Sequence, residues 1–166
     1  MSWIADGLLE QAEHLLDRDP GRPKQASLRR AVSAAYYSLF HLLGGDAGEH
    51  FLGGSYEFRR RLIRIFDHGE MKGACKAVAA RRPLPVFGNV VFPPDLALVA
   101  ETFIDLQEAR HRADYDVTTT FTRHDTRRMV VRARDAFAAW RRVRSRHTSS
   151  SCCSSGSKSS RSVAPR

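Results

Sequence analysis

The sequence predicts an all-α protein, an antiparallel bundle of four main helices with one or two short additional helices. Three observations lead to this prediction. Apolar residues recur at three- to four-residue spacing through several long segments, which is typical of helices with one buried face. Strand-type alternation is nearly absent, and clusters of proline and glycine separate the helical segments. With 166 residues, 42% of them hydrophobic, the chain is long enough to bury a core in one domain.

The first part of the chain is expected to contain two long helices. The first covers about residues 3–18, where Ser2 can cap its start and the prolines and glycine of residues 20–23 stop it. The second covers about residues 24–43, with Gly44–Gly45 as a left-handed C-terminal cap. The predicted buried side of the first helix is Trp3, Leu8, Ala12, Leu15 and Leu16. The main apolar stripe of the second is Leu28, Val32, Ala35, Leu39, Leu42 and Leu43.

Two shorter helices and a loop are expected in the middle of the chain. Ser55 opens a helix with the sequence YEFRRRLIRIF, and a short helix follows at about residues 70–80. The stretch RRPLPVFGNVVFPP then holds four prolines, which predicts a loop. The last of these prolines, Pro94, suits the first turn of the next helix.

The remaining chain is expected to contain two more long helices. The helix that starts near Pro94 carries the apolar stripe Leu96, Val99, Phe103 and Leu106. The β-branched residues 117–122, VTTTFT, predict an extended connector. The last helix covers about residues 125–144, is capped by Asp125, and buries Val130, Ala133, Phe137 and Trp140. Residues 1–146 are thus the expected helical domain, and the Ser-rich residues 147–166 are an expected disordered tail.

The third of the four main helices ends on an unusual polar stretch, EARHRADYDV, residues 108–117. At about 100° per residue, the next positions on its apolar stripe are Arg110 and Asp114, which are spaced to pair along one face. The second helix has a matching feature, because one of its sides carries Arg30, Ala34, Tyr37 and His41. Buried phenol and imidazole groups need hydrogen-bond partners. We therefore expect the Arg110/Asp114 side to pack against the Tyr37/His41 side, with Tyr115 at the margin.

These residues also offer the parts of a metal-independent RNA cleavage site. Such cleavage needs a base with a near-neutral pKa, a cation on the phosphate and a proton donor for the leaving oxygen. Arg110 can bind the phosphate, His41 can act as base or acid, and Tyr115 or Tyr37 can donate a hydrogen bond. The alternative is structural, because Asp114 beside Arg110 neutralises the cation and repels phosphate.

The net charge of +9 indicates a basic surface, which suits RNA or an acidic partner protein. Three of the 27 Lys and Arg residues lie in the last twenty residues, which hold no acid. The last helix is expected to carry an exposed basic side opposite Phe137 and Trp140. An ordinary solvated helix surface is the alternative reading of this side. Its members are Arg127, Arg128, Arg134, Arg141 and Arg142.

Nothing in the sequence indicates a cofactor, a metal site or a membrane segment. Cys75 stands alone and Cys152–Cys153 are adjacent, which gives neither a disulfide framework nor metal-ligand spacing. No glycine cluster is followed by the Lys–Ser/Thr pair of a phosphate-binding loop. The sequence has no apolar window of 18 residues and no basic flank of a signal peptide at its start, so a reducing, cytoplasmic setting is expected.

Three segments together resemble the HEPN domain family, in particular its small single-domain prokaryotic members. They are AVSAAYYSLFHLL (residues 31–43), LQEARHRADYDV (residues 106–117) and ARDAFAAW (residues 133–140), in the order and spacing of that family's AYYxxFH and R…ADY helices. The resemblance covers about residues 1–144. It implies an antiparallel helical bundle, commonly a homodimer, that is frequently associated with a nucleotidyltransferase as a toxin–antitoxin or defence pair.

Many HEPN proteins are metal-independent ribonucleases with an Arg-x4-6-His motif, and this chain departs from that motif. No histidine follows Arg110 at the required spacing. Two functions therefore stay open at this point. The chain is either a ribonuclease or RNA-binding component that uses Arg110, His41 and Tyr115, or a non-catalytic module that binds a nucleotidyltransferase partner. In the second case Arg110, Asp114 and Tyr115 hold the bundle together.

Overall fold

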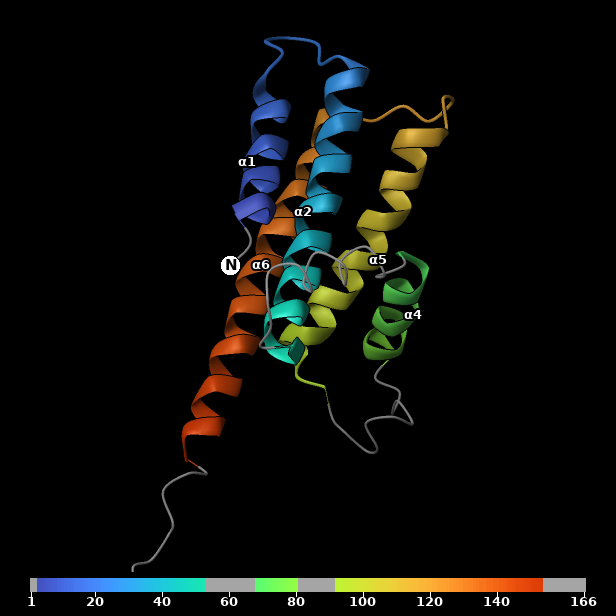
Figure 1. The fold of residues 1–166 in the computed structure, drawn as a ribbon. Coiled ribbons are helices and arrows are strands. Elements are labelled where there is room, and N and C mark those ends of the chain that lie inside the picture. The colour runs from blue at the N-terminus through green and yellow to red at the C-terminus, as the bar shows by residue number, and fades with distance from the viewer. Residues whose placement is uncertain (1–2, 53–67, 81–91, 154–166) are drawn as a thin grey trace, which may run out of the picture.

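A computed structural model of the protein describes residues 3–52, 68–80 and 92–153, with side chains for residues 3–46, 69–80 and 92–146. The described residues form five helices and no strand, which confirms the predicted all-α bundle for this part of the chain. Consecutive long helices run in opposite directions, and the short α4 lies beside α5 (Figure 1). The helices are α1 (Trp3–Asp17), α2 (Gln25–Leu52), α4 (His68–Ala79), α5 (Pro94–Tyr115) and α6 (Arg123–Cys153).

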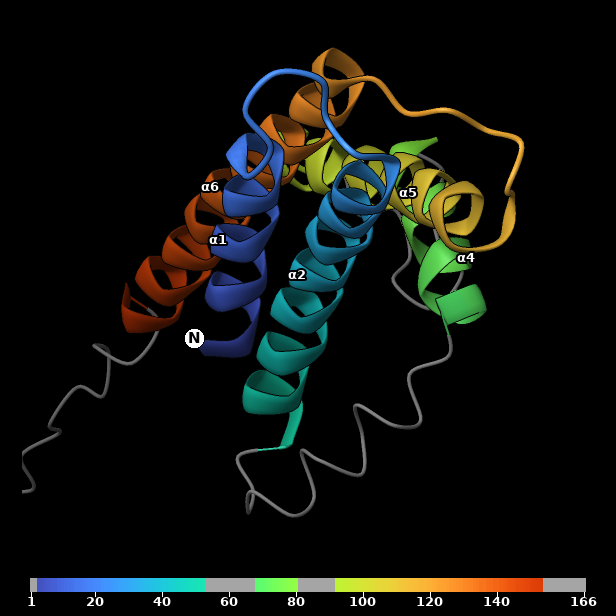
Figure 2. The same cartoon turned by 90° about the horizontal axis from the view of Figure 1, so that it is seen from above.

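The centre of the bundle is α2, which packs against α1, α5 and α6. Figure 2 shows it between α1 and α5. Neighbours on three sides explain why α2 buries residues all around its axis instead of along one stripe. Tyr36 is fully buried and its ring centroid lies 5.5 Å from that of Phe103 on α5. The predicted stripe is buried from Leu28 to Leu42.

The predicted end of α2 at Gly44–Gly45 is wrong, because the helix continues through both glycines to Leu52. Asp46, immediately after them, is 3% exposed and accepts hydrogen bonds from two side chains of α6. Packing against α6 around Asp46 outweighs the weak helix propensity of two adjacent glycines. Tertiary contacts thus carry α2 past its two glycines.

The start of α6 also differs from the prediction, because Thr122 is the capping residue and Asp125 lies within the first turn. The carbonyl of Thr122 accepts the first helical hydrogen bond, from the Thr126 N–H. The Thr122 hydroxyl accepts from the Asp125 N–H at 3.0 Å and donates to the Asp125 carboxylate at 2.6 Å. Such reciprocal bonding between the cap and the third helical residue is typical of helix starts.

The far end of α6 passes the predicted end at residue 144 and reaches Cys153. The predicted boundary at residue 147 therefore falls inside this helix. The rest of the predicted tail, residues 154–166, lies outside the described residues, as do the predicted helix that starts at Ser55 and most of the proline-rich loop. Within α6, Val130, Ala133 and Phe137 are buried as predicted, and Trp140 is half-buried.

One predicted core residue of α1, Trp3, is wrong, because its side chain is 82% exposed. The buried residues Ala5, Ala12 and Leu16 define the face of α1 that packs on α2 and α6. Trp3 precedes Ala5 by two positions, which rotates it by about 200° to the opposite side of the helix. Leu8 and Leu15 are half-buried at the edge of the packed face.

The other predicted elements agree with the structure. The short helix expected at residues 70–80 is α4, and Pro94 occupies the first turn of α5. Residues 116–122 connect α5 to α6 without helix or strand. No helix in the described part of the chain is long and apolar enough to span a membrane.

Two glycines provide a matched stability test of this local structure. Gly7 lies in α1, and a Cβ there would meet no atom within 4 Å. Gly21 has φ +83°, a left-handed conformation that side chains disfavour. We expect Gly7→Ala to raise the free energy of unfolding by about 0.5–1 kcal/mol. Gly21→Ala should lower it by about 1 kcal/mol. Urea denaturation measures both changes in stability. Shifts in the same direction would contradict the helical conformation at Gly7 or the left-handed conformation at Gly21.

Candidate functional site

The polar end of α5 faces α2, next to the apolar contact between these two helices. The buried positions after Leu106 are Ala109 and Ala113, which are 1% and 4% exposed. Arg110 and Asp114 follow one residue later, at the edge of the buried stripe instead of on it, with side chains 20% and 19% exposed. The small alanines let α5 lie close to α2, and the two charged side chains reach across at the rim of this contact.

Arg110 is held from several sides. Its Nε lies 2.6 Å from Asp114 Oδ2, and its Nη2 donates a hydrogen bond of 2.6 Å to the Tyr37 hydroxyl. The guanidinium lies 5.3 Å from the ring centroids of both Tyr37 and Tyr115. Burial alone would lower the pKa of Arg110, but Tyr37 and Asp114 outweigh it and leave this pKa raised, so the group keeps its charge.

Asp114 completes the link between the helices, because its Oδ1 accepts a hydrogen bond of 2.6 Å from the Ser33 hydroxyl of α2. Two polar bonds therefore join α5 to α2, Arg110 to Tyr37 and Asp114 to Ser33. The predicted packing of the Arg110/Asp114 side against the Tyr37 side is confirmed. Ser33 was missed, although it lies four residues before Tyr37 on the same side of α2. We call Arg110, Asp114, Ser33 and Tyr37 the polar cluster.

The other predicted site residues lie around the polar cluster. Tyr115 is 64% exposed and stacks on Arg110 from outside, which confirms its marginal position. His41 lies one turn beyond Tyr37, half-buried, with its ring edge-on to Phe40 at 5.6 Å between centroids. A role for His41 in the cluster stays a prediction. Arg30 is exposed and makes no hydrogen bond or ion pair with another described residue, so it does not belong to the cluster.

Arg29, which the sequence did not single out, binds the C-terminal end of α5. Its guanidinium donates to the carbonyl oxygens of Ala113, Asp116 and Thr119 at 2.8, 2.9 and 2.6 Å, and to that of Arg112 at 3.5 Å. It also lies over the Phe121 ring at 5.8 Å from the centroid. The last carbonyls of a helix have no partner within the helix, and a cation there is favourable. Arg29 therefore fixes both the end of α5 and the connector that follows.

Asp116 stabilises a turn at the start of the connector, residues 116–122. Its carboxylate accepts hydrogen bonds from the backbone N–H and the hydroxyl of both Thr118 and Thr119. These bonds hold the pKa of Asp116 far below its ordinary range, and the bond from the Thr118 hydroxyl has the largest effect. An Asp followed by such donors forms a local turn. The turn directs the chain from α5 back toward α6.

This turn predicts a pH dependence of stability. Below the pKa of an unfolded Asp, about 3.9, the unfolded chain takes up a proton at Asp116 that the folded chain refuses. The contribution of Asp116 is therefore complete above about pH 4 and lost progressively as the pH falls below it. We expect Asp116→Asn to be less stable than wild type at pH 7 and to lose less stability between pH 5 and pH 3, by urea denaturation. Asp135→Asn, at an exposed position of α6, serves as the control, and equal pH profiles for wild type and Asp116→Asn would contradict the prediction.

The predicted basic side of α6 is exposed, but most of its arginines are paired with acids of neighbouring helices. Surface ion pairs of this kind contribute little stability each, yet they offset positive charge that an RNA backbone would need. Arg128 alone of the five makes no ion pair with a described residue. The function of this side as an RNA or partner surface stays a prediction. The pairs are Arg127 with Asp17, Arg134 with Glu13, Arg141 with Asp6 and Arg142 with Asp95.

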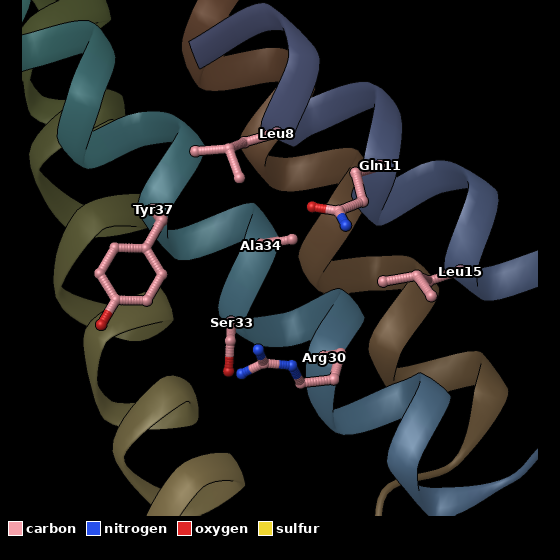
Figure 3. A pocket seen from close by; sticks show the side chains of 7 residues that line it. All are labelled: Leu8, Gln11, Leu15, Arg30, Ser33, Ala34 and Tyr37. Carbon is pink, nitrogen blue, oxygen red and sulfur yellow. The ribbon is translucent and has the colours of Figure 1, made fainter. Parts of the chain in front are cut away.

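A groove of about 130 Å³ lies between α1 and α2, next to the polar cluster. Ser33 and Tyr37 belong to both features, and Figure 3 shows Tyr37 extending from α2 away from α1. The lining is half apolar and holds no acid. Its residues are Leu8, Gln11 and Leu15 from α1 and Arg30, Ser33, Ala34 and Tyr37 from α2.

No group of three or more His, Cys, Asp or Glu side chains among the described residues is placed to hold a metal ion. The guanidinium that a cleavage site would offer to phosphate already faces the carboxylate of Asp114. Comparison of the chain with protein-family models, with curated proteins and with solved structures gives no match.

Proposed function

We propose that this protein is a HEPN-like helical module that binds a protein partner in a nucleotidyltransferase-linked toxin–antitoxin or defence system. In this proposal the polar cluster fixes α5 against α2 and does not cleave RNA. Support for the family comes from the three motif segments and from the all-α bundle in which they pack together. The observation that carries the non-catalytic role is the 2.6 Å ion pair between Arg110 and Asp114.

The surroundings of the ion pair support the structural role. A phosphate approaching Arg110 would meet the negative charge of Asp114, which Ser33 holds in place through a hydrogen bond. The Tyr37 hydroxyl and both tyrosine rings occupy further directions around the guanidinium. An arginine so enclosed suits a structural crosslink, in which the Asp114 charge and the Tyr37 hydrogen bond compensate for its desolvation.

A ribonuclease is the second candidate, and one observation favours it. Tyr115 is exposed, stacks on Arg110 and lies 5.1 Å from the His111 ring, between ring centroids. This edge of α5 therefore combines a cation, a phenol and an imidazole at the surface. If a phosphate displaces Asp114 from Arg110, these groups and His41 supply the acid–base chemistry of metal-independent cleavage.

The first experiment measures cleavage of a labelled, mixed RNA pool by purified protein in EDTA. We expect no cleavage by wild type. We also expect Arg110→Ala to lower the free energy of unfolding by about 1–2 kcal/mol, because it removes the cation beside the Asp114 carboxylate, whose side chain is 19% exposed. Arg112→Ala, at an exposed neighbouring position, is the matched control and should change stability by less than about 0.5 kcal/mol. EDTA-resistant cleavage that is lost in Arg110→Ala and His41→Ala, with intact circular dichroism, would establish the ribonuclease instead.

A second experiment tests partner binding directly. The protein is co-expressed with a nucleotidyltransferase encoded beside it in the genome, and the complex is followed by size-exclusion chromatography and sedimentation. We expect a stable complex with wild type, either with one copy of this chain or with the homodimer that the resemblance implies. Two proteins that elute separately at micromolar concentration would contradict the proposed function.

A further inference from the structure

Two helix stripes border the groove between α1 and α2, and both have the spacing of helix-packing surfaces. On α1 the stripe is Ile4, Leu8, Gln11 and Leu15, and on α2 it is Arg30, Ala34, Tyr37 and His41. Side chains at alternating four- and three-residue steps form the surface through which one helix packs against another. The α1 stripe continues past the groove to Ile4, which is 39% exposed, and the neighbouring Trp3 is 82% exposed. The bundle thus presents an apolar edge that the described residues leave uncovered.

The polar groups of the groove divide into two sets. The hydroxyls of Ser33 and Tyr37 already bond to residues of α5. By contrast, the Arg30 guanidinium and the Gln11 amide make no hydrogen bond or ion pair with any residue of the described chain. The adjacent Arg29 bonds to carbonyls, so of these two neighbouring arginines Arg30 is the one with an unmatched charge. The groove therefore offers one cation beside leucine side chains.

The size of the groove indicates what it can hold. Its volume of about 130 Å³ is smaller than the roughly 300–1,000 Å³ of small-molecule sites. It suits a single inserted side chain, such as one apolar residue of a packed helix. A nucleic acid would need several cations along its path, and Arg30 is the sole cation in the lining. A second copy packed groove to groove would bring another Arg30 and no acid, because no lining residue is acidic.

We propose that the groove between α1 and α2 binds an amphipathic helix of the partner protein, with an apolar side chain inserted between Leu8 and Leu15 and an Asp or Glu paired with Arg30. Helix-in-groove binding of this kind uses apolar anchors at three- and four-residue spacing. The acid supplies the charge that the groove lacks and selects against basic or neutral helices. This inference rests on the proposed function and adds the surface and the chemistry of the partner segment.

The test uses a phage-displayed library of helical peptides, selected on the immobilised full-length protein with counter-selection on Leu8→Asp. We expect the enriched peptides to share an apolar stripe and one acid. Their affinity for Leu8→Asp and Arg30→Glu should fall by about tenfold or more, which corresponds to roughly 1.4 kcal/mol. A Glu→Lys change in the peptide should restore its binding to Arg30→Glu. Val131→Asp and Arg128→Glu, exposed positions of α6, are the matched controls and should bind like wild type.

Several results would overturn the inference. Enriched peptides without an acid, or none that depend on Leu8, would remove the groove as a helix site. A wild-type dimer that Leu8→Asp converts to a monomer in sedimentation would assign the groove to a second copy. RNA that competes for Arg30 but binds Leu8→Asp normally would assign it to nucleic acid. The milder Leu8→Gln repeats each measurement, and circular dichroism checks every fold.

The two proposals can fail separately. A nucleotidyltransferase that still co-purifies with Leu8→Asp and Arg30→Glu, together with a library that yields no acidic helix, would refute the groove and keep the proposed function. Acidic helices that bind the groove, with no complex formed by the nucleotidyltransferase, would refute the proposed partner and keep the groove.

Discussion

Replacing Arg29 with alanine is expected to lower the free energy of unfolding by about 3 kcal/mol. The guanidinium donates to carbonyl oxygens at the end of α5 and in the following connector, between 2.6 and 3.5 Å. Without it, the partly buried acceptors at Ala113, Asp116 and Thr119 lose a charged donor, and each unsatisfied acceptor carries a desolvation cost. Chemical denaturation of wild type and variant measures the difference.

The adjacent Arg30 provides an unusually close control for this prediction. It lies on the same helix, carries the same charge and makes no polar contact with a described residue, so Arg30→Ala should change stability by less than about 0.5 kcal/mol. Arg29→Lys should recover less than half of the loss, because an ammonium group cannot reach carbonyls that a planar fork spans. A loss below about 1 kcal/mol in Arg29→Ala would show that water replaces the guanidinium at these carbonyls.

These two arginines also show where sequence reasoning reaches its limit. Arg29 and Arg30 are the same residue type at adjacent positions, and about 100° of helix rotation separates their side chains. That rotation directs Arg29 toward the end of α5 and leaves Arg30 at the rim of the groove. The sequence singled out Arg30, because it shares a side with Tyr37, and missed Arg29, whose partners are backbone atoms that no side-chain pattern reveals.

Local signals were sufficient wherever a single helix determines the outcome. The position of α5 followed from Pro94 and apolar spacing, and the Arg110–Tyr37 contact followed from two polar sides that each needed a partner. Errors arose where a neighbour decides. Adjacent glycines predict an end to α2, but Asp46 is bound by residues up to 98 positions away in sequence, and the helix continues.

The predicted positive surface on α6 was overestimated for a related reason. A basic helix side predicts a positive surface only if no acids pack beside it. In the structure the acidic residues of α1 meet that side, so charge counted along one helix overstates the local potential. The charge that remains unmatched at the groove, Arg30, lies instead on α2.

The second large effect is expected at the buried contact between α2 and α6. Asp46 is 3% exposed and accepts hydrogen bonds from Arg144 at 2.8 and 2.9 Å and from the Trp140 indole at 2.5 Å. We expect Arg144→Met to lower the free energy of unfolding by about 3 kcal/mol, because it leaves a carboxylate buried without its cation. Arg146→Met is the control on the same helix. Its side chain is 62% exposed, and Asp95 keeps Arg142 as a partner, so the loss should stay below about 1 kcal/mol.

The double variant Asp46→Leu/Arg144→Met separates the cost of an unpaired buried carboxylate from the cost of losing the link between α2 and α6. If the loss in Arg144→Met comes from the uncompensated carboxylate, replacing that carboxylate as well should recover most of it, because an apolar pair avoids desolvation of both charges. If the ion pair instead holds α2 helical past its two glycines, the double variant should stay as unstable as Arg144→Met and lose helical signal. Denaturation curves and circular dichroism of the single and double variants distinguish these results. We expect recovery of stability, since Trp140 and the surrounding apolar residues already pack α2 against α6.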